Sequence, residues 1–248
     1  MHWDAFGRQN PFRAILTNKA DWEQDEFFET GHATVAAVMS ALDADGLGAR
    51  RARALDFGCG AGRLTRALGR FYDESIGVDI APSMIDLAIA LNEGHPGCRF
   101  ALNERGDLSQ FENASFDLVL SLITLQHMRP EYAKGYIREF VRLLHPDGVL
   151  VMQIPGERIP KPSEALLHRR AGRRLAALVP AALRERVRRA RYRRRLAKRP
   201  KMEMYAIPPA EVAAFVEALG ARVIRVAPEG EIFGRWTSVW YTVAKSAA

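Results

Sequence analysis

Residues 54–64 have the sequence ALDFGCGAGRL, in which a short apolar run leads to Asp56 and three glycines follow at alternate positions. Apolar residues then recur at helical spacing as far as Phe71, so the pattern predicts a strand, a tight turn and a helix. Glycine is required where the backbone takes a positive φ, or where a ligand comes too close for a Cβ. Backbone amides at the start of the helix would face whatever lies over the turn. The stretch therefore predicts a ligand site at the end of a strand.

A second apolar run, Ser75–Asp79, ends in an acid 17 residues after Gly62. A carboxylate at the end of the second strand of a βαβ unit can accept hydrogen bonds from both hydroxyls of a ribose. The glycine spacing is Gly-x-Gly-x-Gly, not the Gly-x-Gly-x-x-Gly of dinucleotide-binding proteins, and no Gly-Lys-Ser/Thr follows for a triphosphate. No basic residue between Asp56 and Gly62 could meet a phosphate, and an acid before the glycines suits a cationic ligand.

These features resemble those of the class I S-adenosylmethionine-dependent methyltransferases, and the resemblance covers residues 53–154. It implies an α/β fold with a Rossmann-like sheet of seven strands, mostly parallel with the last strand antiparallel, and helices on both faces. It also implies S-adenosylmethionine as the cofactor and S-adenosylhomocysteine as the product. The positions expected to bind the cofactor are Asp56, Gly58, Cys59, Gly60, Gly62, Asp79, Ile80, Met84, Asp107, Leu108 and Ser121.

Within that set, the resemblance implies that an acid or amide after the third strand accepts a hydrogen bond from the adenine amino group. Asp107 is the predicted acceptor, and a neighbouring backbone N–H would meet the adenine ring. The alternative is that Asp107 only caps a helix or stabilises a turn.

The rest of the chain predicts the other elements of a seven-stranded fold, with helices between the first six strands. We expect helices at residues 26–42, 131–144 and 208–219, and strands at 98–102, 115–121, 149–154, 222–226 and 236–243. Residues 1–27 are aromatic and irregular, and either pack on the body or close over the site as a flap. The expected parts are an N-terminal segment (1–52), a cofactor-binding core (53–156), an Arg-rich helical insertion (157–205) and a C-terminal completion of the core (206–248).

Methyl transfer from a sulfonium is an in-line displacement, in which the enzyme mainly aligns the reactants and excludes water. A hydroxyl or ammonium acceptor must also lose a proton. His127 is the candidate base, because it follows the fourth strand at the edge of the sheet where ligands bind; the alternative is a histidine that only bonds to the backbone. The candidate substrate-binding residues are Trp3, Gln126, Tyr205 and Trp236, of which the aromatic residues are equally open to a role in packing. No metal-ligand spacing is present, so we expect no metal.

Positive charge is concentrated in residues 158–201, which hold 17 Lys and Arg against two acids. Since the whole chain carries +7 and this segment +15, the remainder carries −8. Four interpretations are open: solvated helical faces, a lid for an anionic substrate, a surface that contacts a membrane, or an RNA-binding segment. Tyr192 is its single aromatic residue, which disfavours base stacking and makes nucleic acid the poorer partner.

The composition is that of a globular protein, without an apolar run of the ~18 residues that span a membrane. The first residues do not resemble a signal peptide, and two cysteines do not indicate a disulfide framework, so we expect a cytoplasmic monomer or homodimer. The sequence predicts a small-molecule methyltransferase that acts on oxygen in a natural product or cell-surface metabolite. The alternatives are a methyltransferase of RNA or lipids, and a catalytically silent module that binds the cofactor.

Overall fold

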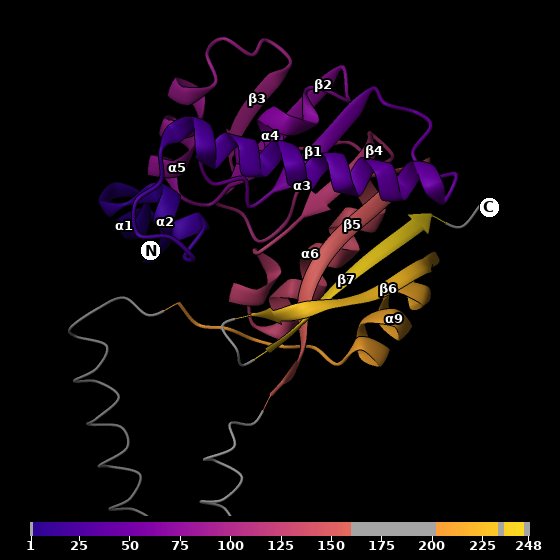
Figure 1. The fold of residues 1–248 in the computed structure, drawn as a ribbon. Helices are drawn as coiled ribbons and strands as arrows, with labels where there is room; N and C mark the ends of the chain where they lie inside the picture. The colour runs from indigo at the N-terminus through magenta and orange to yellow at the C-terminus, as the bar shows by residue number, and fades with distance from the viewer. Residues whose placement is uncertain (1, 160–201, 233–235, 246–248) are drawn as a thin grey trace, which may run out of the picture.

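The computed structural model describes residues 2–159, 202–232 and 236–245 (Figure 1). Its elements, in chain order, are α1 (His2–Gln9), α2 (Pro11–Ile15), α3 (Gln24–Ala44), β1 (Arg53–Phe57), α4 (Arg63–Leu68), β2 (Glu74–Asp79), α5 (Pro82–Leu91), β3 (Cys98–Leu102), β4 (Phe116–Ser121), the 3₁₀ turn η1 (Leu125–His127), α6 (Pro130–Leu143), β5 (Leu144–Arg158), α9 (Pro209–Ala218), β6 (Ala221–Ile232) and β7 (Trp236–Lys245). The basic helices expected from the sequence fall in residues 160–201, outside the described residues.

The strands form one sheet in the order β3-β2-β1-β4-β5-β7-β6. Neighbouring strands from β3 to β5 pair in parallel, whereas β7 pairs antiparallel with both β5 and β6. The expected seven-stranded, mostly parallel fold is confirmed. Because strand order reverses between β1 and β4, the carboxyl ends of these strands open the crevice in which such sheets bind ligands.

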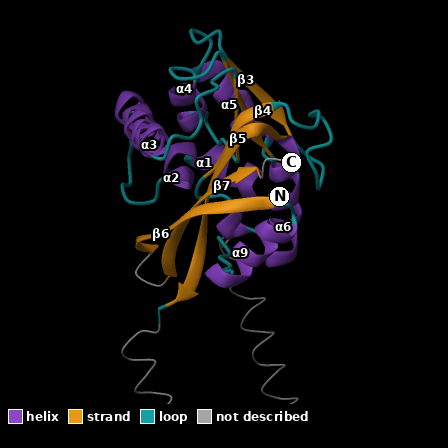
Figure 2. Ribbon diagram, turned by 90° about the vertical axis from the view of Figure 1, so that its right-hand side faces the viewer, coloured by secondary structure: helices purple, strands orange, loops and turns teal. Residues whose placement is uncertain are grey.

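Helices cover both faces of the sheet, with α3 and α4 on one face and α6 and α9 on the other (Figure 2). Strand β4 is buried along its whole length, as a central parallel strand must be. Its side chains alternate between the two layers: Leu118 packs with the α3–α4 layer, and Val119 packs with the α6–α9 layer. This alternation fixes the register of β4, since a slip of one residue would exchange the two sets.

Three expectations about local structure were wrong. The expected helix between the third and fourth strands is absent from the described residues, and an irregular loop, residues 103–115, connects β3 to β4. Residues 1–27 are not irregular throughout, because α1 and α2 form there; Asn10 separates the two and its side chain accepts from the Arg13 N–H at 3.1 Å, as an N-cap does. Helix α4 ends at Leu68 rather than near Phe71.

Strand β5 is longer than residues 149–154 because pairing begins at Leu144, opposite Phe116 of β4. Between there and the Leu118–Val149 pair the register shifts, so residues 145–148 form an irregularity within the strand. No helix in the described part of the chain is long and apolar enough to cross a membrane. The division of the chain into four parts stays a prediction.

Candidate active site

A cavity of about 230 Å³ lies at the carboxyl ends of β1, β2 and β4, beneath α1 and α2. Its lining is mostly apolar, and Asp79 is its single acid among the described residues. The lining residues are Trp3, Ala14, Ile15, Phe57, Gly58, Gly60, Val78, Asp79, Ile80, Met84, Asn103, Leu122, Ile123, Thr124, His127, Met128 and Tyr136. Of the residues expected from the sequence to bind cofactor or substrate, the structure brings six to this cavity, and the candidate base His127 lines it as well. The six are Trp3, Gly58, Gly60, Asp79, Ile80 and Met84.

The glycine turn follows β1 and forms one wall of the cavity. Gly58 has φ +81° and a Cβ there would lie 2.2 Å from the Thr124 Oγ1 atom, so no other residue fits without displacing the loop after β4. Gly60 has φ +52°, and its missing Cβ leaves room for Ile15 of α2. The amides of Gly58 and Cys59 donate to the Val78 carbonyl at 2.8 and 3.0 Å, which ties the turn to β2.

Asp79, at the end of β2, has its carboxylate held by backbone amides on two sides. The Gly60 N–H donates to Oδ2 at 3.0 Å and the Ala81 N–H donates to Oδ1 at 2.9 Å. Burial raises the pKa of this carboxyl, and the two amides oppose that rise by favouring the anion. Each oxygen keeps acceptor capacity toward the cavity, since a carboxylate oxygen has two lone pairs.

Four of the expected cofactor positions lie behind the cavity wall rather than in it. The Asp56 carboxylate accepts from the Thr65 hydroxyl at 2.7 Å, and burial raises its pKa to about 6. Cys59 is buried against Gly77, and a Cβ on Gly62 would meet Phe100 and Asn92. The Ser121 hydroxyl donates to the Phe57 carbonyl at 3.3 Å. These residues pack against the glycine turn on the side away from the cavity.

Asp107 and Leu108 lie away from the cavity, which corrects their expected role at the adenine. The Asp107 carboxylate accepts from the hydroxyl and the N–H of Ser109, which also lowers its pKa. Leu108 is buried in the core, and its N–H donates to Glu139 at 2.9 Å. Both groups are therefore engaged within the loop and its neighbouring helix.

Asn103, which the sequence interpretation did not single out, lines the cavity at the end of β3. It is buried, and its Oδ1 atom has no hydrogen-bond partner in the described part of the chain. Its Nδ2 atom donates to the Tyr136 hydroxyl at 3.4 Å. Asn103 is the first residue after β3, whose Leu102 pairs with Asp79. Its place at the end of β3, next to Asp79 at the end of β2, was the feature of the sequence that could have indicated Asn103.

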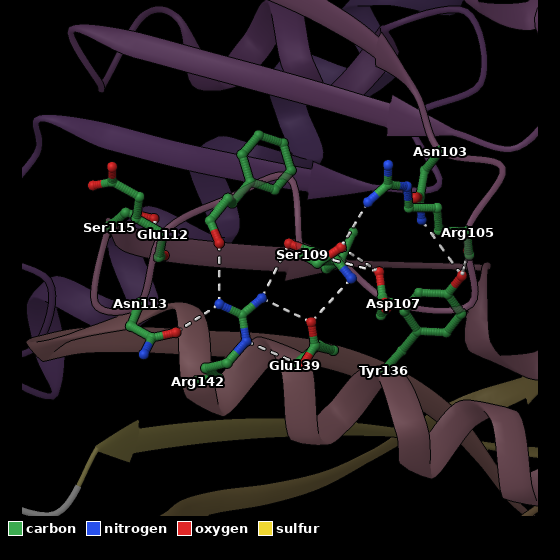
Figure 3. A network of polar contacts seen from close by, with 12 residues as sticks. Asn103, Arg105, Asp107, Ser109, Glu112, Asn113, Ser115, Tyr136, Glu139 and Arg142 are labelled. Carbon is green, nitrogen blue, oxygen red and sulfur yellow. Dashed lines mark hydrogen bonds and ion pairs between the residues drawn. The ribbon is translucent and has the colours of Figure 1, made fainter.

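The loop that carries Asn103 is fixed to α6 by polar contacts (Figure 3). Arg142 donates to the carbonyl oxygens of Leu108 and Phe111, each at 3.0 Å, and forms an ion pair with Glu139. Tyr136 donates to the Arg105 carbonyl at 2.9 Å. The loop lacks secondary structure, so these side chains supply the partners that its backbone carbonyls would otherwise lack.

His127 lies at the end of η1 with its ring against Trp3, at 4.8 Å between ring centroids. Its Nδ1 atom is 2.9 Å from the Glu203 carbonyl oxygen, which can only accept, so Nδ1 carries the proton in the neutral ring. Its Nε2 atom then accepts from the Gln126 amide nitrogen at 3.1 Å. Burial lowers the pKa of His127. A neutral imidazole with a basic Nε2 follows from these contacts.

The N-terminal helices cover the cavity and are attached to α5. Asp4 of α1 accepts from the Ser83 N–H through Oδ1, and its backbone carbonyl accepts from the Ser83 hydroxyl, both at 3.1 Å. A Cβ on Gly7 would meet Ser83 and Met84, so α1 lies close against α5. Trp3, Ala14 and Ile15 reach the cavity from this layer.

The other candidate substrate residues do not line the cavity. Gln126 is buried beside His127, and its carbonyl accepts from the Tyr205 N–H at 2.8 Å. The Tyr205 hydroxyl donates to Glu203 at 2.7 Å. Trp236 begins β7, where it pairs with Arg158 and Ile232. Among the described residues, no group of three His, Cys, Asp or Glu side chains is arranged to hold a metal ion.

Comparisons with known proteins identify the domain that contains this cavity. A family model described as "Methyltransferase domain" matches residues 55–152. The chain is 29% identical over 151 residues to a ubiquinone biosynthesis O-methyltransferase of Xanthomonas oryzae pv. oryzae (strain PXO99A), and 28% identical over 151 residues to one of Xanthomonas campestris pv. campestris (strain B100). Each match covers 60% of this chain and 54% of the relative, so the chain spans about half the length of the curated relatives it matches.

Solved structures share the fold over nearly the whole chain. The magnesium protoporphyrin IX methyltransferase from Synechocystis PCC 6803 with bound SAH has a TM-score of 0.60 at 19% identity, and the match covers 98% of this chain and 94% of that one. The PH0226 protein from Pyrococcus horikoshii OT3 has a TM-score of 0.62 at 18% identity, covering 95% and 98%. At these identities the likeness concerns the fold alone. Residues 55–152 therefore form a methyltransferase domain within a Rossmann-like fold, as expected for a class I S-adenosylmethionine-dependent methyltransferase.

Proposed function

We propose that this protein transfers a methyl group from S-adenosylmethionine to an oxygen of a small molecule. The observation that carries the proposal is Asp79, whose carboxylate is held by the Gly60 and Ala81 amides and faces a cavity built on the glycine turn. This acid lies within the segment that the methyltransferase model matches. A mostly apolar cavity with one fixed anion suits a ligand that combines a ribose with a cationic sulfonium.

The residues at the cavity fit the parts of the cofactor. Asp79 would accept from the two ribose hydroxyls, and the Asn103 Oδ1 atom, buried without a partner, would accept from the adenine amino group. Ile80 and Met84 offer apolar surface to the faces of the adenine ring. The glycine turn leaves room for the amino-acid part beside its backbone. The bound cofactor supplies the methyl carbon, and the chain aligns that carbon with the acceptor.

His127 would act as the base that takes the acceptor's proton. The Glu203 carbonyl fixes the proton on Nδ1 and leaves the lone pair on Nε2, the nitrogen that must face the acceptor. An acceptor hydroxyl at Nε2 would replace the donor now supplied by Gln126. Tyr136 is a poorer candidate, because burial raises its pKa and its hydroxyl already donates to Arg105.

An oxygen acceptor with an apolar body is the substrate class that we propose. The two relatives named above are O-methyltransferases by name. The cavity lining contains no Lys or Arg among the described residues, and it includes the apolar side chains of Leu122, Met128 and Trp3, the last of which lies against His127. Such a wall favours an aromatic or aliphatic group over an anionic one, because a buried anion without a partner is strongly disfavoured.

A labelled-methyl assay tests the proposal directly. The purified chain is incubated with S-adenosylmethionine labelled in the methyl group and with separate extract fractions: small molecules, lipids and RNA. We expect label in an organic-soluble small molecule, and methanol release on mild base treatment if the acceptor is a carboxylate rather than a hydroxyl. Label in RNA or in lipids supports those alternatives instead. Calorimetric binding of the cofactor without transfer to any fraction supports the silent module.

Asn103→Ala is expected to weaken cofactor binding by about 5-fold, because one hydrogen bond to a neutral group contributes ~1 kcal/mol net. The loss should appear with S-adenosylhomocysteine in calorimetry. Asn113→Ala is the matched control: Asn113 lies on the same loop and accepts from Arg142, but it does not line the cavity. Equal losses in the two variants would assign Asn103 to loop stability rather than to the ligand.

Asp4→Ala is expected to speed cofactor dissociation several-fold, because it removes the side-chain acceptor that attaches α1 to the start of α5. Stopped-flow displacement of the bound cofactor measures this rate. Arg8→Ala is the control, since Arg8 pairs with Asp4 but is itself exposed, and an exposed pair contributes little. An unchanged rate in Asp4→Ala would mean that α1 does not limit cofactor exit.

A further inference from the structure

Ile123, in the loop after β4, has a backbone conformation that its side chain disfavours. Its φ is +59°, in the left-handed region, and Ala114 is the other described residue besides glycine with a positive φ. A β-branched side chain in this region crowds its own backbone, so the conformation persists only where surrounding contacts impose it. Ile123 also lines the cavity. The strain therefore lies at the site itself.

Two side chains impose this conformation from the neighbouring strands. The Ile123 N–H donates to Gln153 Oε1 of β5 at 3.1 Å, and Gln153 Nε2 donates to the Ser238 hydroxyl of β7 at 2.7 Å. Chemistry determines the orientation of the Gln153 amide, because a backbone N–H can only donate and must meet the amide oxygen. Ser238 is buried, and its hydroxyl oxygen accepts from Gln153 Nε2, which leaves Gln153 Oε1 turned toward the Ile123 N–H.

The strained residue determines the path from β4 to His127. Leu122, Ile123 and Thr124 all line the cavity, and the Thr124 side chain fills the space beside Gly58. The turn η1, which carries His127, starts at the next residue. A change of φ at Ile123 would therefore move Thr124 from the glycine turn and displace His127 relative to it.

We propose that Gln153, oriented by Ser238, is a positioning residue that holds Ile123 in the left-handed conformation and so sets His127 against the glycine turn. Gln153 does not line the cavity and acts only through Ile123. The effect on turnover rests on the proposed methyl transfer. The effect on the backbone at Ile123 does not, and it can be measured without any substrate.

The first test is a rescue. Gln153→Leu removes the acceptor and should lower kcat by about 10- to 100-fold, since a displacement of about 1 Å is enough for such a loss. The Kd for S-adenosylhomocysteine should change little, because Asp79 and Asn103 are untouched. Adding Ile123→Gly should recover part of kcat, because glycine adopts a positive φ without the hydrogen bond from Gln153. Gln153→Glu, which keeps an acceptor for Ile123, should retain more activity than Gln153→Leu.

The second test needs no activity. Urea unfolding is measured for the parent, Gln153→Leu, Ile123→Gly and the double variant. If Gln153 imposes strain, Ile123→Gly should be less destabilising in the parent, where it relieves that strain, than in Gln153→Leu, where the backbone has already relaxed. Ala114→Gly is the matched control, because Ala114 also has a positive φ but lies in the loop before β4, and its effect should be the same in both backgrounds.

The outcomes separate the two proposals. Additive unfolding energies at Ile123 and Gln153, or a kcat loss that Ile123→Gly does not recover, would overturn the positioning role of Gln153. If the parent transfers no methyl group but the unfolding energies are coupled, the positioning role of Gln153 stands and the proposed function is overturned instead.

Discussion

Asp79→Ala is expected to raise the Kd for S-adenosylmethionine and S-adenosylhomocysteine by about 10²- to 10⁴-fold. The carboxylate would accept from two ribose hydroxyls, and hydrogen bonds to a charged group contribute roughly 1.5–3 kcal/mol each. The substitution also leaves the Gly60 and Ala81 amides without their present acceptors, which loosens the turn. Calorimetric titration of the parent and variant measures the effect for both ligands.

Two companion variants separate the ribose contact from a loss of structure. Asp79→Asn keeps the size of the side chain but loses the charge and one acceptor, so we expect an intermediate Kd. Asp86→Ala removes an exposed acid from α5 that does not line the cavity, and should leave Kd unchanged. If Asp79→Ala binds as tightly as the parent while remaining folded by circular dichroism, the ribose assignment is wrong.

His127→Ala is expected to lower kcat by about 10²- to 10⁴-fold, the usual contribution of a positioned general base. The Kd for the cofactor should stay within a few-fold of the parent, because His127 lies on the Trp3 side of the cavity and makes no contact with Asp79 or Asn103. Steady-state kinetics with the identified acceptor, combined with calorimetry, distinguishes the two quantities. A kcat within a few-fold of the parent would exclude His127 as the base.

The pH profile gives an independent check of the same residue. Only the neutral imidazole can accept a proton, so turnover should fall as pH drops through the pKa of His127. Burial lowers that pKa below its ordinary value of 6.5, so the acidic limb of kcat should lie below pH 6.5. The limb should be missing from the residual activity of His127→Ala. An acidic limb that survives unchanged in the variant would assign it to another group.

The parts of the site that were predictable share one physical origin. Asp79, Gly58 and Gly60 lie at the ends of strands or in the turn between a strand and a helix, where local sequence pattern and backbone geometry coincide. Asp107 was chosen without a local pattern to guide the choice, because its loop has no periodicity. In the folded chain its carboxylate accepts from Ser109, and Arg142 holds the loop through the Leu108 carbonyl. Asn103 was missed because its distinguishing property, a buried oxygen without a partner, does not exist before folding.

The amino-acid sequence by itself determined the strand-turn-helix at residues 54–64, the acid at position 79 and the positions of the parallel strands along the chain, because these depend on local periodicity and on where glycine is needed. The tertiary structure alone decided the state of His127 and the conformation of Ile123. His127 depends on a carbonyl at Glu203, and Ile123 depends on Gln153 and Ser238, all distant in sequence. Hydrogen bonds between such groups follow from the pairing of whole strands and segments, which no local pattern specifies.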